Sequence, residues 1–193
     1  MRDAILDAAP ELAAVGHQMR IVDEAGADLG AAFPVAPLHR GFDLRRLIRL
    51  GLPVFPSSIM YRRAARTLRA ADFEIYDWYL FTDILRAGPA AYLHEQLGAY
   101  RIHTASQVAR ERGEVMTQRM AGLYRRRLAE MPQHRADFMA RGLMWAWHGL
   151  FDEGRIDGSV LDLVRASFTF RAIGPFIDAF RWARANKAAH VRR

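Results

Sequence analysis

Three segments between Pro56 and His103 decide the fold: PSSIMYRR (56–63), FEIYDWYLFTDILRAG (73–88) and AAYLHEQLGAYRIH (90–103). The middle segment predicts a helix headed by Asp77, because apolar residues recur after it at helical spacing. The last segment predicts a strand that ends on basic residues. A carboxylate at a helix N-terminus is stabilised by the helix dipole by about 0.3–1 kcal/mol, so Asp77 has a structural role as a cap. The functional alternative is a general base that faces a cleft.

In this order the three segments resemble the acceptor-side half of family 2 glycosyltransferases, which have the GT-A fold. The resemblance covers residues 1–103 and implies an α/β domain with a small mixed sheet and flanking helices. It implies that Asp77, followed by Trp78, is the catalytic base. It also implies that His103, at the end of the Tyr-Arg-x-His strand, helps to hold a metal ion.

Glycosyl transfer by an inverting enzyme needs a base near the acceptor hydroxyl, and a positioned base typically contributes about 10²–10⁴-fold in rate. An indole beside the acid suits a sugar, because its face packs on C–H groups. The alternative for the pair is a helix cap at Asp77 and a core side chain at Trp78. The resemblance favours the catalytic interpretation.

Four further residues are candidates, each with a structural alternative. Ser57 and Ser58 either cap the helix that we expect to follow them or line the acceptor or sugar pocket. Arg101 either contacts the diphosphate, whose oxygens match a guanidinium, or is a surface arginine. One imidazole makes no metal site, so His103 would bind Mg²⁺ or Mn²⁺ only with two carboxylates supplied from elsewhere.

The Asp-x-Asp motif that holds the metal and the nucleotide in this family is missing; its nearest match, Asp72-Phe73-Glu74, lies too close to Asp77. We therefore expect the chain to begin inside a glycosyltransferase domain, as a truncated or split enzyme of polysaccharide biosynthesis. A partner chain would then supply the N-terminal half, and the substrates would be a nucleotide sugar and a glycan or lipid-linked acceptor. The rival hypothesis is a non-catalytic half-domain that binds the acceptor or a partner.

Charge separates the two halves of the chain. Residues 1–103 hold 12 basic and 12 acidic side chains, whereas 104–193 hold 16 and 9, which accounts for the net charge of +7. The second half predicts an all-helical basic extension. A nucleic-acid module ranks last, because its motifs are absent and the aromatic residues fall at core spacing, so we expect no nucleic-acid partner. The basic segment 175–193 is either a helix at an anionic membrane or a packed helix with a frayed end.

The composition is that of a globular protein, with 51% hydrophobic and 25% charged residues and no cysteine. This excludes disulfides, thiol catalysis and Cys-ligated zinc. No signal peptide or spanning segment is evident, and Asp3 and Asp7 lie where an apolar leader would be. We expect a cytoplasmic protein, whose C-terminal segment could make peripheral contact with the inner face of the membrane.

Local patterns predict the elements in order. In the first half we expect a helix over 3–14, a strand over 15–22, a Gly/Ala/Pro-rich connection over 27–41, a helix over 44–50 capped by Asp43, and a helix over 59–68. In the second half we expect helices over 104–131, 135–150 and 159–171, and a fourth helix after a break at Gly174-Pro175.

Overall fold

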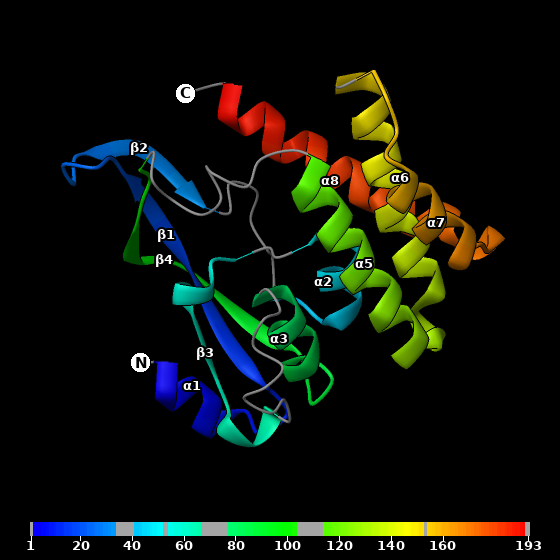
Figure 1. Cartoon of the computed structure of the whole chain (residues 1–193). Helices are drawn as coiled ribbons and strands as arrows, with labels where there is room; N and C mark the ends of the chain where they lie inside the picture. Colours follow the sequence, from blue (N-terminus) through cyan, green and yellow to red (C-terminus); the bar gives the residue numbers. More distant parts are fainter. Residues whose placement is uncertain are drawn as a thin grey trace. The chain divides into compact units, whose positions relative to one another are not determined.

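The structure is a computed structural model that describes residues 2–33, 41–51, 54–66, 77–103, 114–152 and 154–191 (Figure 1). It divides into two compact units. The first, which we call the sheet unit, comprises Met1–Leu47, Gly51–His103 and Ala185–Arg193. The second, the helical unit, comprises Ile48–Leu50 and Thr104–Arg184.

The sheet unit holds four strands, two whole α-helices and parts of two others in its described residues. The strands are β1 (Ala14–Val22), β2 (Asp28–Phe33), β3 (Ile59–Tyr61) and β4 (Ala90–Arg101). The α-helices are α1 (Arg2–Ala8), the first part of α2 (Leu44–Leu50), α3 (Asp77–Ile84) and the end of α8 (Ile173–Val191), with short 3₁₀ turns η1 (Pro56–Ser58) and η2 (Arg63–Ala65). The prediction of an α/β protein with a small mixed sheet and flanking helices is confirmed.

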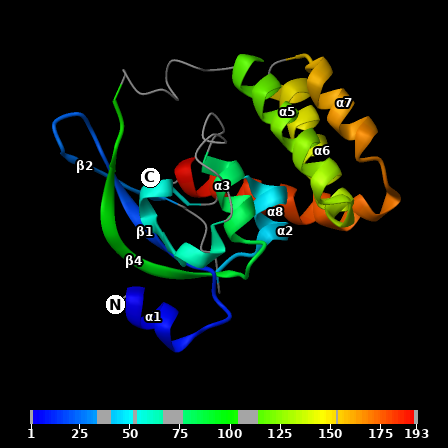
Figure 2. The same ribbon diagram turned by 60° about the horizontal axis from the view of Figure 1, so that its bottom comes forward.

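Strand β1 organises the sheet. It pairs in parallel with β4 from Ala14 opposite Ala90 to Val22 opposite Arg101, and Figure 2 shows β4 as a long curved strand beside it. It pairs antiparallel with β3 at its start and with β2 at its end. Most β1 side chains are buried, as expected for a strand with neighbours along its whole length. The core of the sheet unit includes Val15, Leu47, Val54, Phe81 and Ile84.

The expected helix over 3–14 ends at Ala8, ahead of Pro10, and Ala14 already belongs to β1. Two further predictions in this unit are wrong. Within the expected connection over 27–41, Asp28–Phe33 forms β2, because hydrogen bonding to β1 outweighs the poor strand propensity of Gly30 and its alanine neighbours. Within the expected helix over 59–68, Ile59–Tyr61 forms β3 against Ala14–Gly16, and a 3₁₀ turn follows it as far as the structure describes this segment, to residue 66. In both places a tertiary pairing determines the local structure.

Arg62, which follows β3, ties this segment to the end of α1. Its guanidinium donates to the carbonyl oxygens of Leu6, Leu12 (2.8 Å) and Ala9 (3.2 Å). These include carbonyl groups that the end of a helix leaves without partners. The arginine therefore closes α1 and fixes the start of β1.

Helix α2 has the ends that were predicted. The Asp43 side chain accepts from the backbone N–H of Arg46 at 2.8 Å, and Gly51 ends the helix with a φ of +79°. Just before Asp43, Gly41 has a φ of +95°, and a Cβ there would overlap the carbonyl oxygen of Ala90. Only glycine allows this approach, which brings Phe42 into a backbone bridge with Ala90.

The helical unit is built from α5 (Glu114–Glu130), α6 (Arg135–Asp152), α7 (Gly158–Ala166) and the part of α8 (Ile173–Val191) that precedes Ala185, with 3₁₀ turns η4 (Pro132–His134) and η5 (Phe170–Ala172). Helix α7 packs on both α5 and α6, and the three lie side by side in Figures 1 and 2. The largest fully buried side chains here are Tyr124, Phe138, Ile48, Met131, Leu163 and Val160. Residues 104–113 of the first expected helix lie outside the described residues.

Two predicted boundaries in this unit are wrong. Helix α7 ends at Ala166 and not at Arg171, because Ser167 turns back and donates from its hydroxyl to the carbonyl oxygen of Leu163 at 2.6 Å. Gly174-Pro175 does not precede α8 but lies in its first turn. Proline is tolerated there, since the first N–H groups of a helix have no partner within it.

A buried ion pair lies at the centre of the helical unit. Asp137 is buried, and its carboxylate lies 2.9 Å from Nε of Arg49. In the last turn of α2, the carbonyl oxygen of Ile48 accepts a hydrogen bond from the Tyr124 hydroxyl (3.2 Å). The carbonyl oxygen of Leu50 accepts one from the Arg141 guanidinium (3.1 Å). Side chains of α5 and α6 therefore satisfy the carbonyl groups at this helix end.

None of the helices in the described part of the chain has the length and apolar character needed to cross a membrane.

Candidate functional site

Asp77 is the first residue of α3, and its side chain is exposed. Desolvation by neighbouring protein atoms nevertheless raises the pKa of its carboxyl group above the ordinary value of 3.8. Within the described residues this carboxylate forms no hydrogen bond or ion pair. An accessible carboxylate with a raised pKa has the properties of a general base.

Trp78, the next residue, points into the protein. Only 3% of it is exposed, and its indole N–H donates to the carbonyl oxygen of Leu47 at 3.4 Å. The indole therefore packs in the core and fixes α3 against α2. The face of the indole is therefore not accessible to a sugar in this structure, whereas the carboxylate of the neighbouring Asp77 is accessible.

Ser57 and Ser58 lie in η1, directly before β3. The Ser58 side chain is fully buried and its hydroxyl donates to the carbonyl oxygen of Phe55 at 2.7 Å, as expected of a residue that stabilises a turn. Ser57 is exposed, and its hydroxyl lies 3.7 Å from the sulfur of Met19 in β1. Of the two serines, Ser57 has the geometry to contact a ligand.

Arg101 and His103 lie at the far end of β4. Arg101 is opposite Val22, and the backbone N–H of Ile102 donates to the carbonyl oxygen of Val22 at 2.9 Å. Both Arg101 and His103 are exposed. No cluster of three or more metal-ligating side chains occurs among the residues that the structure describes, and Asp72-Phe73-Glu74 lies outside them. The described residues therefore do not form a metal site by themselves.

Asp77 and Trp78 lie at the start of α3, the serines in η1, and Arg101 and His103 at the end of β4. The structure brings the last two groups together, because the ring of Phe55, just before η1, stacks on that of Tyr100, just before Arg101, with centroids 3.8 Å apart. In the same part of β1 as Met19, which Ser57 contacts, it adds a residue that sequence reasoning missed. His17 is buried in β1, two residues from Met19, and a Cβ on Gly98 of β4 would lie 3.3 Å from its ring. The alternation of β1 was the available signal, because it places His17 and Met19 on one side of the strand.

Two further buried polar side chains of the sheet unit were also missed. Asp83 lies on α3, six residues after Asp77, and is 5% exposed. Tyr92 lies on β4 against Gly16, and burial raises its pKa. Its hydroxyl has no hydrogen-bond partner within the described residues. The only sequence signal for Asp83 was its position on the apolar side of α3.

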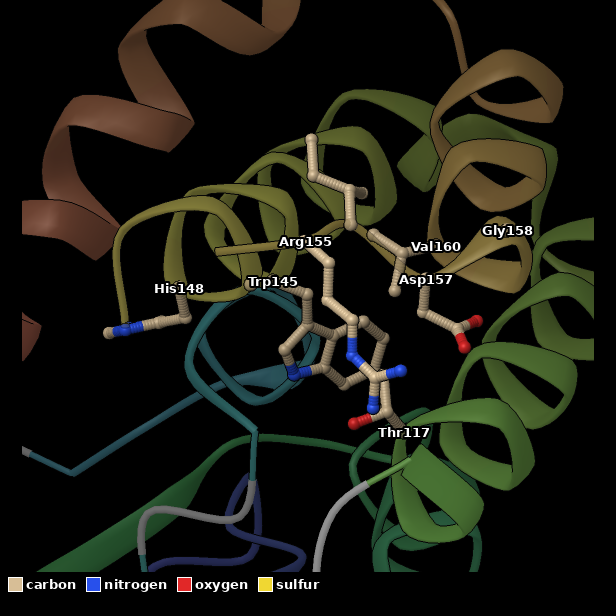
Figure 3. Close-up of a pocket in the computed structure, with 9 residues that line it drawn as sticks. Thr117, Trp145, His148, Arg155, Asp157, Gly158 and Val160 are labelled. Carbon is tan, nitrogen blue, oxygen red and sulfur yellow. The ribbon is translucent and has the colours of Figure 1, made fainter. Parts of the chain in front are cut away.

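A separate cavity of about 350 Å³ lies within the helical unit (Figure 3). Its lining comes from α5, α6, the loop before α7 and α7 itself: Thr117, Trp145, His148, Gly149, Arg155, Ile156, Asp157, Gly158 and Val160. In Figure 3 the Arg155 side chain extends toward Thr117, whereas His148 and Asp157 extend to opposite sides. The volume lies within the range of small-molecule sites.

The cavity is held in shape by local contacts. Arg155 N–H donates to the carbonyl oxygen of Gly149 at 2.9 Å, and a Cβ on Gly149 would lie 2.5 Å from the Arg155 carbonyl oxygen. Trp145 is packed edge to face on Tyr124, with ring centroids 4.8 Å apart. Asp157 accepts from the backbone and hydroxyl of Ser159 and from Gln118, and these hydrogen bonds lower its pKa. The lining thus includes the Arg155 guanidinium and the Trp145 indole, one face of which is covered by the Arg141 guanidinium 4.7 Å from the ring centroid.

Comparisons with protein-family models, with curated proteins and with solved structures found no match to this chain.

Proposed function

We propose that this chain carries the acceptor side of a family 2-like glycosyltransferase, in which Asp77 is the base for transfer of a sugar from a nucleotide sugar to a glycan or lipid-linked acceptor. The observation that carries the proposal is the accessible carboxyl group at the first turn of α3, whose pKa is raised by desolvation. A higher pKa makes the carboxylate a stronger base for the acceptor hydroxyl, provided that it remains ionised at the working pH.

The arrangement of the sheet supports the proposal at the level of the fold. The sheet unit is α/β with a small mixed sheet and flanking helices, which is the coarse fold that the resemblance implies. Many functions share such folds, so this is support by analogy. The catalytic claim rests on Asp77.

The nucleotide-binding half would come from a longer form of the polypeptide or from a partner chain, because no Asp-x-Asp motif is present. That half would supply the carboxylates with which His103 could bind Mg²⁺ or Mn²⁺, a Lewis acid for the leaving diphosphate. Arg101, exposed at the end of β4, would contact the same diphosphate. Ser57, exposed beside β1, would contact the acceptor or the sugar.

The proposal is tested with a fusion that joins the Asp-x-Asp half of a family 2 glycosyltransferase ahead of residue 1. Release of nucleoside diphosphate is measured with a panel of glycan and lipid-linked acceptors, for the fusion and for the Asp-x-Asp half alone. We expect release that depends on an acceptor only with the fusion. A fusion that is no more active than the half alone on every acceptor would contradict the proposal.

The chain on its own should bind nucleoside diphosphate sugars only in the millimolar range, roughly −4 kcal/mol, because the motif that holds them is missing. Isothermal titration calorimetry with and without Mn²⁺ measures this directly. Micromolar, Mn²⁺-dependent binding would mean that the nucleotide site is in this chain and not in a second half.

The second candidate function is non-catalytic binding of the acceptor, and the cavity beside Trp145 favours it. Sugars bind where an aromatic face meets planar polar side chains, and here Trp145 and Arg155 line one cavity. Quenching of tryptophan fluorescence by oligosaccharides tests this function. Arg155→Ala should weaken such binding, whereas Arg171→Ala, outside the cavity, should not. Binding that is equal in both variants would exclude the cavity.

A further inference from the structure

The turn between α7 and α8 exposes large apolar side chains. Phe170 is 81% exposed, Ile173 63%, Phe168 57% and Ile177 41%, and we call these four residues the junction patch. The Phe168 and Phe170 rings contact each other, with centroids 5.4 Å apart. Ile173 and Ile177 are one turn apart on α8 and so lie on the same side of it. Contiguous exposed apolar side chains of this size mark an interaction site.

The turn that displays the junction patch is itself well anchored. Ala172 is 1% exposed, and Thr169 donates from its backbone to the sulfur of Met139 at 3.0 Å. The Thr169 hydroxyl accepts from the backbone N–H of Arg171 at 3.4 Å. The residues between the two phenylalanines and after them are thus fixed to the helical unit, while the aromatic rings point into solvent.

Apolar exposure continues from α8 toward the end of α6. Phe180, three residues after Ile177, contacts the ring of Trp147 with centroids 5.3 Å apart. Trp147 in turn packs on Phe151, which is exposed together with Leu150. Aromatic and aliphatic side chains of two helices therefore form one exposed band that begins at the junction patch.

Basic side chains flank the junction patch. From Arg165 to Arg184, the last part of the helical unit, four side chains are basic (Arg165, Arg171, Arg181 and Arg184) and one is acidic, Asp178, which is paired with Arg49 at 3.3 Å. Arg165 lies 3.7 Å from Asp162, and Asp152 follows the exposed Phe151 at the end of α6. Arg171 is exposed between Phe170 and Ile173, so a surface that covers the junction patch meets a cationic group there.

We propose that the junction patch docks the helical unit on an anionic lipid membrane, with Phe168, Phe170 and Ile173 inserted among the headgroups. Aromatic and aliphatic side chains bury into the interface, and each nearby arginine raises the affinity for an anionic surface about fivefold. A second copy of the chain fits less well, because like charges would face each other across the contact.

This docking surface differs from the one expected from the sequence, which placed the membrane contact in 175–193. The insertion comes from the turn ahead of that segment, and the basic residues of α8 supply attraction. The inference does not depend on the glycosyltransferase proposal, because it uses neither Asp77 nor the sheet unit.

Co-sedimentation with vesicles tests the inference on the whole chain. We expect binding to vesicles of equal parts phosphatidylglycerol and phosphatidylcholine, little binding to phosphatidylcholine alone, and weaker binding as salt is added. Phe168→Ser with Phe170→Ser should lower the partition coefficient at least about tenfold, since two phenylalanines no longer leave water. Leu29→Ser with Leu97→Ser is the matched control, because it removes two exposed apolar side chains (53% and 43%) of the sheet unit and should change binding less than about twofold.

Two more variants separate insertion from charge. Phe170→Trp should restore or increase binding, because tryptophan is favoured at the membrane interface. Arg171→Ser should lower binding to the anionic vesicles about fivefold and leave the phosphatidylcholine value unchanged. Equal binding by the wild type and the double phenylalanine variant would overturn the proposal. A second result would also overturn it. In that result the wild type binds no vesicles but forms a dimer in sedimentation velocity, and the double phenylalanine variant does not form this dimer.

Discussion

The two units of this chain differ in the contacts that stabilise them and in the charged and apolar side chains that they carry. The sheet unit is closed by backbone approaches, as at Gly41 and Ala90, and residues 1–103 carry equal numbers of basic and acidic side chains. The helical unit has a buried ion pair in its interior and carries most of the excess positive charge, with exposed phenylalanines at its turn. The difference indicates a division of work, in which one unit holds a carboxylate in place and the other presents a surface.

The largest effect should follow from removing the backbone approach in the sheet unit. Gly41→Ala should lower the free energy of unfolding by about 4 kcal/mol or more, because the new Cβ overlaps the Ala90 carbonyl oxygen and φ is +95°. Gly26→Ala is the control, since Gly26 has a φ of +89° but open space around it, and should cost only about 1 kcal/mol. Urea denaturation measures both; equal losses would mean that the approach at Gly41 does not stabilise the unit.

In the helical unit the corresponding test removes the buried carboxylate. Asp137→Ala should lower the free energy of unfolding by about 3 kcal/mol, because Arg49 loses the buried one of its two carboxylate partners and keeps only the exposed Asp178. Asp162→Ala removes a carboxylate from an exposed pair with Arg125 and should cost less than about 1 kcal/mol. Thermal unfolding of the two variants compares them. A smaller loss at Asp137 than at Asp162 would contradict the assignment of the buried pair as the anchor of this unit.

The smallest effect concerns the start of α7. Asp157→Ala should cost about 1 kcal/mol at neutral pH, because the cap is lost. Hydrogen bonds lower the folded-state pKa of Asp157 below 3.8, so its contribution is complete above that value and is lost as the pH falls through the lowered pKa. The difference between wild type and variant, measured by urea denaturation against pH, should therefore shrink at strongly acidic pH. A difference that is unchanged there would assign the effect to packing.

Sequence patterns predicted those elements whose signals are local. Asp43 and Gly51 mark the ends of α2, and the apolar spacing after Asp77 marks α3, because caps and periodicity act within one helix. Strands β2 and β3 could not be predicted in this way, since Gly30 and the Ile59–Tyr61 segment form strands only through pairing with β1.

For the candidate site, too, only the features with a local sequence signal could be predicted. The position of Asp77 followed from the chain, but the burial of Trp78 and Ser58 depends on the tertiary structure. The cavity beside Trp145 draws on α5, α6 and α7 together, so no single segment predicts it.

The role of Asp77 as a catalytic base is tested most directly by the turnover of the fusion enzyme that carries Asp77→Asn. Asparagine cannot accept the proton of the acceptor hydroxyl, so kcat should fall about 10²-fold or more. Asp43→Asn, which changes a carboxylate to an amide at the cap of α2, should keep kcat within about twofold, because asparagine caps a helix as well as aspartate.

The pH dependence of kcat in the wild-type fusion is a second test of the role of Asp77. Because the base form exists only above the raised pKa of Asp77, the acid limb of kcat should lie above pH 3.8 and should be absent from the residual activity of the variant. Turnover of Asp77→Asn within about threefold of the wild type, with the acid limb retained, would contradict the claim and leave Asp77 as a structural residue at the head of α3.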